Sequence, residues 1–284
     1  MMRASVVLWV VVSLVTSACG GGPEGPPTAP TPLPLPPLPV TPGRHVVTIA
    51  GDGVTLGGLL YLPTSGAPRP AIILLHGWQP PGTNGAALLE GRAARFADQG
   101  YVALALSLRG WPPSGGTDDC GLRQPDDVVA AAAWLRTVPG VTPDRIALVG
   151  FSQGGQVALL AAGRDARLRG VAAYFPVTDV ARWKTTTANA DIPGYITSTC
   201  EPGGTAPRSP LVRAGDITAP VLLVHGDADV RVPTEQSRLL YDALIAAGRR
   251  ASLELIPGAQ HGFTATEEAV AGPLVERFLA SVLD

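Results

Sequence analysis

Residues 145–162, which read RIALVGFSQGGQVALLAA, constrain the fold of this chain more than any other stretch. Residues 146–149 form a short apolar, β-branched run, which is typical of a buried parallel strand. Residues 150–154 fit G-x-S-x-G, and residues 156–162 are rich in strong helix formers. So sharp a turn from strand to helix needs small residues beside Ser152, because the two backbones nearly touch. The pattern predicts Ser152 at a helix N-terminus, where free amides favour developing negative charge.

An ordinary tight turn can also match the pentapeptide, so the flanking strand and helix are what favour a nucleophilic Ser152. With the doubled glycine Gly154-Gly155, the motif resembles the nucleophile elbow of the α/β-hydrolase superfamily, in particular its dienelactone hydrolase and prolyl oligopeptidase-like branches. The resemblance runs from about Val46 to the C-terminus. It implies a doubly wound, mostly parallel sheet of about eight strands, and catalysis without a cofactor or metal. Dienelactone hydrolases proper use a cysteine nucleophile, so Ser152 argues against that specific activity.

Length and composition predict a single catalytic domain. The chain has 284 residues, 46% of them hydrophobic, which is enough to bury one large core. The formal net charge of −2 provides no basic surface for nucleic acid. We expect the domain to span residues 44–284 and to contain a cap, inserted at about residues 176–220, that is small, irregular and rich in Thr, Gly and Pro.

The N-terminus has the features of a signal peptide, expected to span residues 1–18. Arg3 precedes a ten-residue apolar run at 6–15, which is too short to span a membrane. The sequence around Cys19 resembles a bacterial lipobox, although Thr16 stands where leucine is usual. Ordinary cleavage after Ala18 is the alternative, and either route exports the protein.

Residues 19–43 are expected to form a tether behind a lipid anchor on Cys19. Half of residues 23–42 are proline and charge is almost absent, so this segment cannot bury a core. A polyproline spacer of this length spans roughly 60 Å. The predicted location is therefore the bacterial cell envelope, outside the cytoplasm, with the domain held away from the membrane.

Strands and helices are expected to alternate through the domain. The predicted strands are 46–49 and 54–62 as an opening hairpin, then 71–75, 101–106, 146–149, 171–175, 221–224 and 252–256. The predicted helices are 86–99, 156–162, 234–247, 267–283 and one that Asp126 or Asp127 caps and that reaches Val138.

The base follows by elimination. In this fold the triad residues follow the order Ser, acid, His, at the carboxyl ends of strands. The chain has four histidines, of which His45 and His76 precede the nucleophile. His225 ends a strand before any candidate acid, which leaves His261. Its neutral imidazole would take the serine proton and return it to the leaving group; the alternative is an ordinary surface histidine.

The candidate acids are Asp227 and Asp229, in the segment HGDADVRVP. This segment resembles the family pattern H-G-x-x-D-x-x-V-P, which implies that Asp229 is the triad acid. Asp227 then suits a turn in which it bonds its own backbone. Two carboxylates in one tight turn make a poor metal site without further ligands.

An oxyanion hole needs two backbone amides aimed at the tetrahedral oxygen. Gln153, directly after the nucleophile, is expected to supply one amide. The resemblance implies that Trp78, the residue after His76-Gly77, supplies the other. The Trp78 side chain suits either an apolar pocket wall or an ordinary core position, and His76 is expected to bond the loop backbone.

A disulfide between Cys120 and Cys200 is predicted on different grounds. If Cys19 is lipidated, these are the two remaining thiols, and export places them where disulfides persist. Both follow strands, so both should lie on the same rim of the sheet as Ser152. The bridge would close a loop of about 80 residues, worth roughly 4 kcal/mol in the chain-entropy account. Two unrelated thiols are the alternative.

These observations predict an exported serine hydrolase that cleaves carboxylic esters of small molecules through Ser152, His261 and Asp229, by way of an acyl-enzyme. A peptidase that uses the same residues on short peptides is the alternative within the family. A binding lipoprotein that has lost catalysis is the alternative outside it, and the complete set of Ser, Asp and His argues against it.

Lipidation can be tested on the full-length chain expressed in a bacterium. We expect the protein to partition with membranes and to incorporate labelled palmitate, and Cys19→Ser to abolish both. Cys120→Ser is the matched control and should keep the label. Soluble export of unlabelled wild-type protein would instead indicate ordinary signal cleavage.

Overall fold

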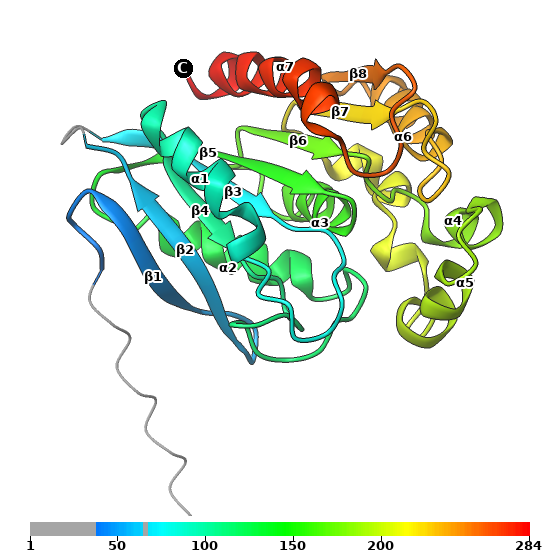
Figure 1. Cartoon of the computed structure of the whole chain (residues 1–284), viewed down its shortest axis with the longest axis horizontal. Coiled ribbons are helices and arrows are strands. Elements are labelled where there is room, and N and C mark those ends of the chain that lie inside the picture. Colours follow the sequence, from blue (N-terminus) through cyan, green and yellow to red (C-terminus); the bar gives the residue numbers. More distant parts are fainter. Residues whose placement is uncertain (1–37, 65–67) are drawn as a thin grey trace, which may run out of the picture. The chain divides into compact units, whose positions relative to one another are not determined.

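The computed structural model of the chain describes residues 38–64 and 68–284 (Figure 1). The predicted signal peptide, Cys19 and most of the predicted tether lie outside the described residues. The described part contains one eight-stranded sheet with the strand order β1-β2-β4-β3-β5-β6-β7-β8. Its strands are β1 (Gly43–Ala50), β2 (Thr55–Leu62), β3 (Arg69–Leu75), β4 (Val102–Leu106), β5 (Val141–Phe151), β6 (Gly170–Tyr174), β7 (Val221–Gly226) and β8 (Ala251–Ile256).

Strand direction places the candidate site at one edge of the sheet. β2 is antiparallel to both of its neighbours, β1 and β4, and all later neighbours are parallel. Residues 146–149 of β5 are buried, which explains why this strand reads as an unbroken apolar run. The carboxyl ends of the parallel strands share one edge, and the arrowheads of β5 and β6 point toward the cap (Figure 1).

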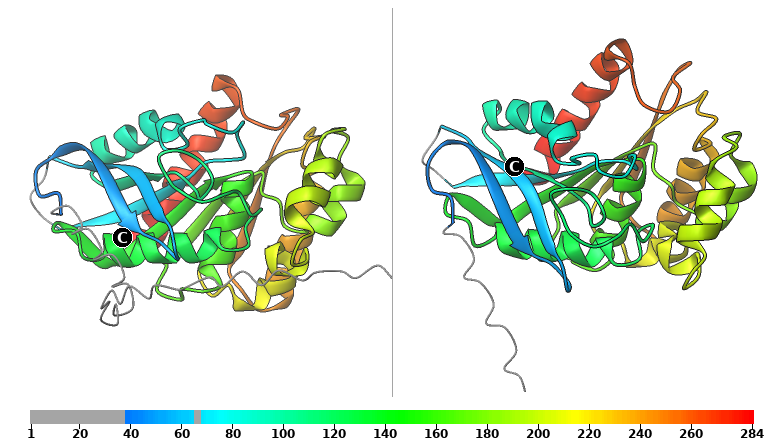
Figure 2. Two further views of the ribbon diagram at one scale, coloured as in Figure 1. Left: turned by 90° about the horizontal axis from the view of Figure 1, so that it is seen from below. Right: turned by 60° about the horizontal axis from the view of Figure 1, so that its bottom comes forward.

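Helices cover both faces of the sheet. α1 and α7 pack on one face, and α2, α3 and α6 pack on the other (Figure 2). Their bounds are α1 (Glu90–Asp98), α2 (Gln124–Leu135), α3 (Gln153–Ala162), α6 (Glu235–Ala246) and α7 (Ala265–Leu283). Among the described residues, none of the helices has the length and hydropathy that a membrane span requires. The predicted α/β-hydrolase fold class is confirmed.

The predicted cap lies between β6 and β7 and is built from short helices. These are α4 (Val180–Thr186), α5 (Ile192–Tyr195), the single-turn elements η2 (Ile196–Cys200) and η3 (Ala206–Arg208), and η4 (Pro210–Asp216), which is kinked at Arg213. Its small apolar core packs Trp183, Ile192 and Ile196 with Val232 from the loop after β7. The cap is therefore small, as the sequence predicts, and it is held partly by the loop that carries the candidate acid.

The predicted bounds of α2 are wrong at both ends. The helix begins at Gln124 and Arg123 is its N-cap, so Asp126 and Asp127 lie within the first turn. Pro125 explains the early start, because its fixed φ suits the first helical turn and its missing N–H has no partner to lose there. The α-helix ends at Leu135. Beyond it the hydrogen bonding changes to the 3₁₀ pattern, in which the Val138 amide donates to the Leu135 carbonyl three residues earlier.

Asp127 does not cap α2 but forms a buried ion pair with Arg109. Its two carboxylate oxygens accept hydrogen bonds of 2.8 Å each from the guanidinium of Arg109, in the loop after β4. Arg109 also donates to the Asp52 carbonyl at 2.7 Å, in the turn between β1 and β2. Both charged side chains are 1% exposed, so this pair joins three segments inside the protein.

We expect Asp127→Asn to lower the free energy of unfolding by about 3 to 5 kcal/mol, because it leaves the Arg109 charge buried and unpaired. Asp126→Asn is the matched control. Its ion pair with Arg164 lies at the surface, where such pairs contribute about 1 kcal/mol or less. Urea unfolding followed by circular dichroism measures both, and equal losses would contradict the assignment.

Candidate active site

Ser152 lies at the junction of β5 and α3 with a backbone geometry that L-residues rarely adopt. Its φ is 53° and its ψ is −116°. The Ser152 amide donates to the Tyr174 carbonyl of β6 at 2.9 Å, so the strained residue is tied to the neighbouring strand. Strain of this kind persists only where the surroundings impose it.

The glycines of the motif are required by the close approach of backbones. A Cβ on Gly150 would lie 2.2 Å from the Gly154 carbonyl oxygen, and one on Gly154 would lie 2.3 Å from the Leu75 carbonyl oxygen. A Cβ on Gly155 would lie 3.0 Å from Cβ of Pro176, which explains the doubled glycine. The predicted turn is therefore present, together with its physical reason.

His261 follows β8 and lies beside Ser152. Its Nε2 is 3.0 Å from the Ser152 Oγ, and its Nδ1 is 2.7 Å from Oδ2 of Asp229. The ring packs edge-on against Phe175, with ring centroids 4.8 Å apart. The structure thus brings Ser152, His261 and Asp229 into one hydrogen-bonded chain, from segments far apart in the sequence.

Asp229 is buried and surrounded by donors. Its Oδ1 accepts the amides of Arg231 and Val232 at 2.9 Å each. Burial by itself would raise the pKa of Asp229, but the hydrogen bonds from His225 and His261 outweigh it and hold that pKa well below its ordinary value. The carboxylate is therefore ionised and suited to orient a histidine and stabilise its positive charge.

His225 is a second histidine on this carboxylate, and the sequence analysis gave it no role. Its Nε2 lies 2.8 Å from the Val232 carbonyl oxygen and 3.3 Å from Oδ2 of Asp229. A carbonyl only accepts, so we assign the proton to Nε2 and let Nδ1 accept from the Ser237 hydroxyl at 2.7 Å. His225 thus helps to position the Asp229 carboxylate. The sequence feature that could have indicated this role is its place as the first residue of the H-G-x-x-D segment.

Asp227, the other candidate acid, does not approach His261. Its Oδ1 accepts the Gly258 amide at 2.6 Å, so it stabilises the loop after β8. It therefore has a turn role, although it bonds that neighbouring loop and not its own backbone. Among the described residues, no group of three or more His, Cys, Asp or Glu side chains gathers as metal ligands.

His76 organises the loop after β3. Its Nδ1 donates to the Gly77 carbonyl at 2.8 Å, and its Nε2 accepts the Leu108 amide at 3.0 Å. Burial lowers the pKa of His76 to about 4, so the ring is neutral and can accept that bond. The next residue, Gly77, comes so close to the nucleophile that a Cβ there would lie 3.1 Å from Cβ of Ser152. The same loop places Trp78 at the rim of the site.

Gln153, the other residue expected at the oxyanion hole, is the first residue of α3. The first amides of a helix have no acceptor within the helix, so this N–H is free to face a ligand. The Gln153 side chain is buried, and its Nε2 donates to Asp118 at 2.8 Å and to Gln124 at 3.1 Å. Burial raises the pKa of Asp118, and hydrogen bonds from Cys120, Tyr195 and Gln153 oppose that shift.

A cavity of about 550 Å³ opens over Ser152 and His261. The cap contributes Trp183, Ile192 and Tyr195 to its wall, and the loop after β3 contributes Trp78. Trp78 is 40% exposed, which makes its side chain part of the rim and excludes a core position. The lining also includes one acidic residue, Asp191, and one arginine, Arg231. The cavity wall therefore combines several aromatic side chains with polar ones, and it has room for a small molecule.

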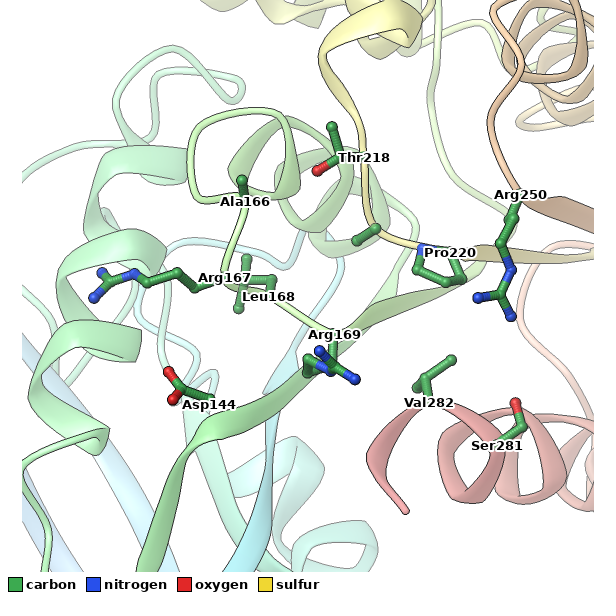
Figure 3. A pocket seen from close by; sticks show the side chains of 11 residues that line it. Asp144, Ala166, Arg167, Leu168, Arg169, Thr218, Pro220, Arg250, Ser281 and Val282 are labelled. Carbon is green, nitrogen blue, oxygen red and sulfur yellow. The ribbon is translucent and has the colours of Figure 1, made fainter.

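A second cavity, of about 430 Å³, lies away from this chemistry. It is lined by segments that precede β6, β7 and β8, including Arg169, Pro220 and Arg250 (Figure 3). These residues belong to the amino ends of the strands, the edge opposite Ser152. Ligands in such sheets bind at the carboxyl ends, so we place the candidate site in the first cavity.

Cys120 and Cys200 form a disulfide, as the sequence predicts, with their Cα atoms 5.2 Å apart. The bond joins the loop after β4 to the cap, and Cys120 also lines the cavity over Ser152. The predicted position of both cysteines on the nucleophile's rim is therefore correct.

Comparison with known proteins identifies the chain's relatives. The sequence profile of the prolyl oligopeptidase family matches residues 89–280. The uncharacterised peptidase YtmA of Bacillus subtilis is 29% identical over 221 residues, which cover 72% of this chain and 82% of that protein. The esterase LipC of Mycobacterium tuberculosis is 29% identical over 249 residues, which cover 75% of this chain and 57% of that protein.

Similarity also extends to solved structures. A puromycin-hydrolysing peptidase of Mycobacterium tuberculosis superimposes with a TM-score of 0.75 at 23% identity. The matched region covers 84% of this chain and 39% of that protein, so the chain spans about two fifths of the solved relative. At this identity the likeness demonstrates a shared fold.

The geometry yields a test that separates the two aspartates. We expect Asp229→Asn to lower kcat by about 10³- to 10⁴-fold, because it favours the wrong imidazole tautomer. Asp227→Asn, the matched control two residues away, should leave kcat within about threefold of the wild type. Steady-state hydrolysis of an activated ester measures both, and the reverse order would identify Asp227 as the acid.

Proposed function

The chain belongs to the prolyl oligopeptidase family, and on that premise we propose that it is a serine hydrolase that cleaves carboxylic esters through a Ser152–His261–Asp229 triad. The observation that carries the proposal is the unbroken chain from the Ser152 hydroxyl to the Asp229 carboxylate, with spacings of 3.0 and 2.7 Å through His261. Such a chain prepares a serine hydroxyl for attack on a carbonyl. Binding without catalysis does not require this hydrogen-bonded chain, so its presence favours an enzyme over a binding protein.

In the proposed reaction, the Ser152 Oγ attacks the ester carbonyl while the His261 Nε2 takes the hydroxyl proton. The amides of Gln153 and Trp78 stabilise the negative charge on the tetrahedral oxygen. His261 then returns the proton to the leaving alcohol, and an acyl-enzyme remains on Ser152. Water, activated by the same histidine, releases the carboxylic acid. Asp229 stays ionised throughout and holds the imidazole in one tautomer.

The lining of the cavity favours small esters over peptides. Recognition of a peptide's free α-amine calls for a carboxylate inside the pocket, because a buried charge needs a partner. The carboxylate that the cavity offers is Asp191, which is exposed on the cap. The wall is otherwise mostly aromatic and apolar, which suits an acyl or aryl group.

A peptidase is the second candidate, and specific relatives favour it. YtmA is named as a peptidase, and the similar solved structure is that of a puromycin-hydrolysing peptidase. LipC, which is named as an esterase, supports the first candidate at the same identity to this chain. The same triad would serve both reactions, since they differ mainly in the leaving group that His261 must protonate.

We further propose that the enzyme works outside the cytoplasm, anchored by a lipid on Cys19. The apolar run at residues 6–15 and the lipobox-like sequence support this location. The Cys120–Cys200 disulfide supports it independently, because such bonds persist in oxidising compartments.

The purified domain, residues 44–284, tests the proposed reaction. We expect it to hydrolyse p-nitrophenyl butyrate with a higher kcat/KM than a p-nitroanilide of the same acyl group. Ser152→Ala should lower kcat by about 10⁴-fold or more, since triad members act as a unit. Ser281→Ala, an exposed serine on α7, is the matched control. Turnover of aminoacyl anilides in preference to esters would favour the peptidase, and full activity of Ser152→Ala would refute the triad.

A further inference from the structure

Tyr195, at the end of α5 in the cap, contacts one residue of the candidate oxyanion hole directly and the other through Asp118. Its ring packs edge-on against Trp78, with ring centroids 6.0 Å apart. Its hydroxyl donates to Oδ2 of Asp118 at 2.8 Å. Trp78 is one of the two residues expected to supply an oxyanion amide, and Asp118 contacts the other.

Asp118 connects the cap to Gln153. Its Oδ1 accepts the Gln153 Nε2 at 2.8 Å, the Gln124 Nε2 at 3.2 Å and the Cys120 amide at 2.9 Å. With the Tyr195 hydroxyl on Oδ2, the carboxylate therefore receives four donors. Because a carboxylate oxygen accepts hydrogen bonds, the side-chain NH2 group of Gln153 must face Asp118, and this fixes the orientation of the Gln153 side chain. The side chain of the residue after the nucleophile is thus held from the cap side.

The disulfide joins the same two segments. Cys120 comes two residues after Asp118, and Cys200 comes five residues after Tyr195. Cys120 is one of the few described non-glycine residues with a positive φ, at 55°. Its carbonyl accepts the Gln156 Nε2 at 3.1 Å, from the helix that begins at Gln153. The disulfide therefore holds the loop after β4 next to the cap, close to the hydrogen bond between Tyr195 and Asp118.

We propose that Tyr195 is a positioning residue for the oxyanion hole. It holds Trp78 through its ring and Gln153 through Asp118, and the Cys120–Cys200 disulfide keeps it in place. This inference rests on the proposed function, because an oxyanion hole matters only where a tetrahedral oxygen forms. Its consequence is that the cap forms part of the catalytic apparatus as well as the substrate pocket.

The physical reason is that oxyanion stabilisation depends on fixed geometry. Backbone amides stabilise the developing charge only when they point at the place where it forms before the reaction starts. Trp78 is 40% exposed, so burial does not hold it. Gln153 directly follows the strained Ser152, and the hydrogen bonds of its buried side chain help to fix its position. Small displacements in a supporting shell are enough to weaken a site of this kind.

The experiment compares Tyr195→Phe, Asp118→Asn and the double variant Cys120→Ser/Cys200→Ser with the wild-type domain. Tyr241→Phe is the matched control, because Tyr241 lies on α6 and packs against the sheet core. Each protein is assayed for kcat and KM with p-nitrophenyl acetate, whose small acyl group limits contact with the cap. The rate constant for labelling by a fluorophosphonate is measured as well. The final extent of labelling gives the fraction of correctly folded sites.

Tyr195→Phe keeps the ring contact and removes only the donor to Asp118. We expect its kcat per labelled site to fall about tenfold, with a similar fall in the labelling rate constant and little change in KM. Asp118→Asn and the double cysteine variant should lower kcat by about 10- to 100-fold, which is less than the loss of a whole oxyanion donor. Tyr241→Phe should match the wild type.

Two results would overturn the proposal. One is that Tyr195→Phe and Asp118→Asn keep the control's kcat and labelling rate. The other is that they change KM alone, which would make Tyr195 a substrate contact. If only the double cysteine variant keeps full kcat, the disulfide has no part in positioning.

The two proposals fail in distinguishable ways. If the wild-type domain reacts with the fluorophosphonate but turns over no ester, the proposed ester hydrolysis fails. The labelling rates still decide the role of Tyr195 in that case, because an oxyanion also develops on phosphorus. If the wild-type domain does not react at all, both proposals are wrong.

Discussion

The close approach of β5, α3 and the end of β3 around Ser152 is the constraint on which the rest of the site depends. The serine adopts a positive φ because its neighbours lie too close together for any other path. Strain at such a residue costs about 1–3 kcal/mol and must be offset elsewhere. Here the buried strands on both sides of β5 and the bond from the Ser152 amide to Tyr174 hold it. The hydroxyl is thereby fixed relative to the edge where the later loops arrive.

The loops after β7 and β8 contribute donors that surround the buried carboxylate of Asp229. A carboxylate removed from water has to be surrounded by donors, and Asp229 receives them from two backbone amides and two histidines. His225 connects this carboxylate to Ser237 on α6, so the acid is anchored to a helix as well as to its own loop. His261 lies between Asp229 and Ser152, and its hydrogen bond to the firmly held Asp229 carboxylate orients its ring.

The cap and the loop after β4 complete the opposite side of the cavity. The cap has a small apolar core, and polar contacts and one disulfide join it to the loop after β4. Arg208 illustrates this, since its guanidinium donates to the carbonyls of Pro202, Gly204 and Asp119, two within the cap and one in the loop after β4. Relatives named as a peptidase and as an esterase match 72% and 75% of this chain, respectively. In this chain much of the cavity wall lies in the cap and the loops, outside the sheet that positions Ser152.

The sequence by itself determined the features that follow from local pattern and fixed order. Apolar strand runs, the glycines around Ser152 and the segment around Asp229 each act over a few residues, so the fold class and the three candidate triad positions were predictable. Tertiary structure alone decided the contacts that join distant segments. Asp127 was one of two residues expected to cap a helix, yet it pairs with Arg109, and both charged side chains are buried together. Asp118 and Tyr195 carry no local signature, and His225 has only its place in the H-G-x-x-D segment. The contacts of all three formed only when the folded sheet brought its carboxyl-end loops and the cap together.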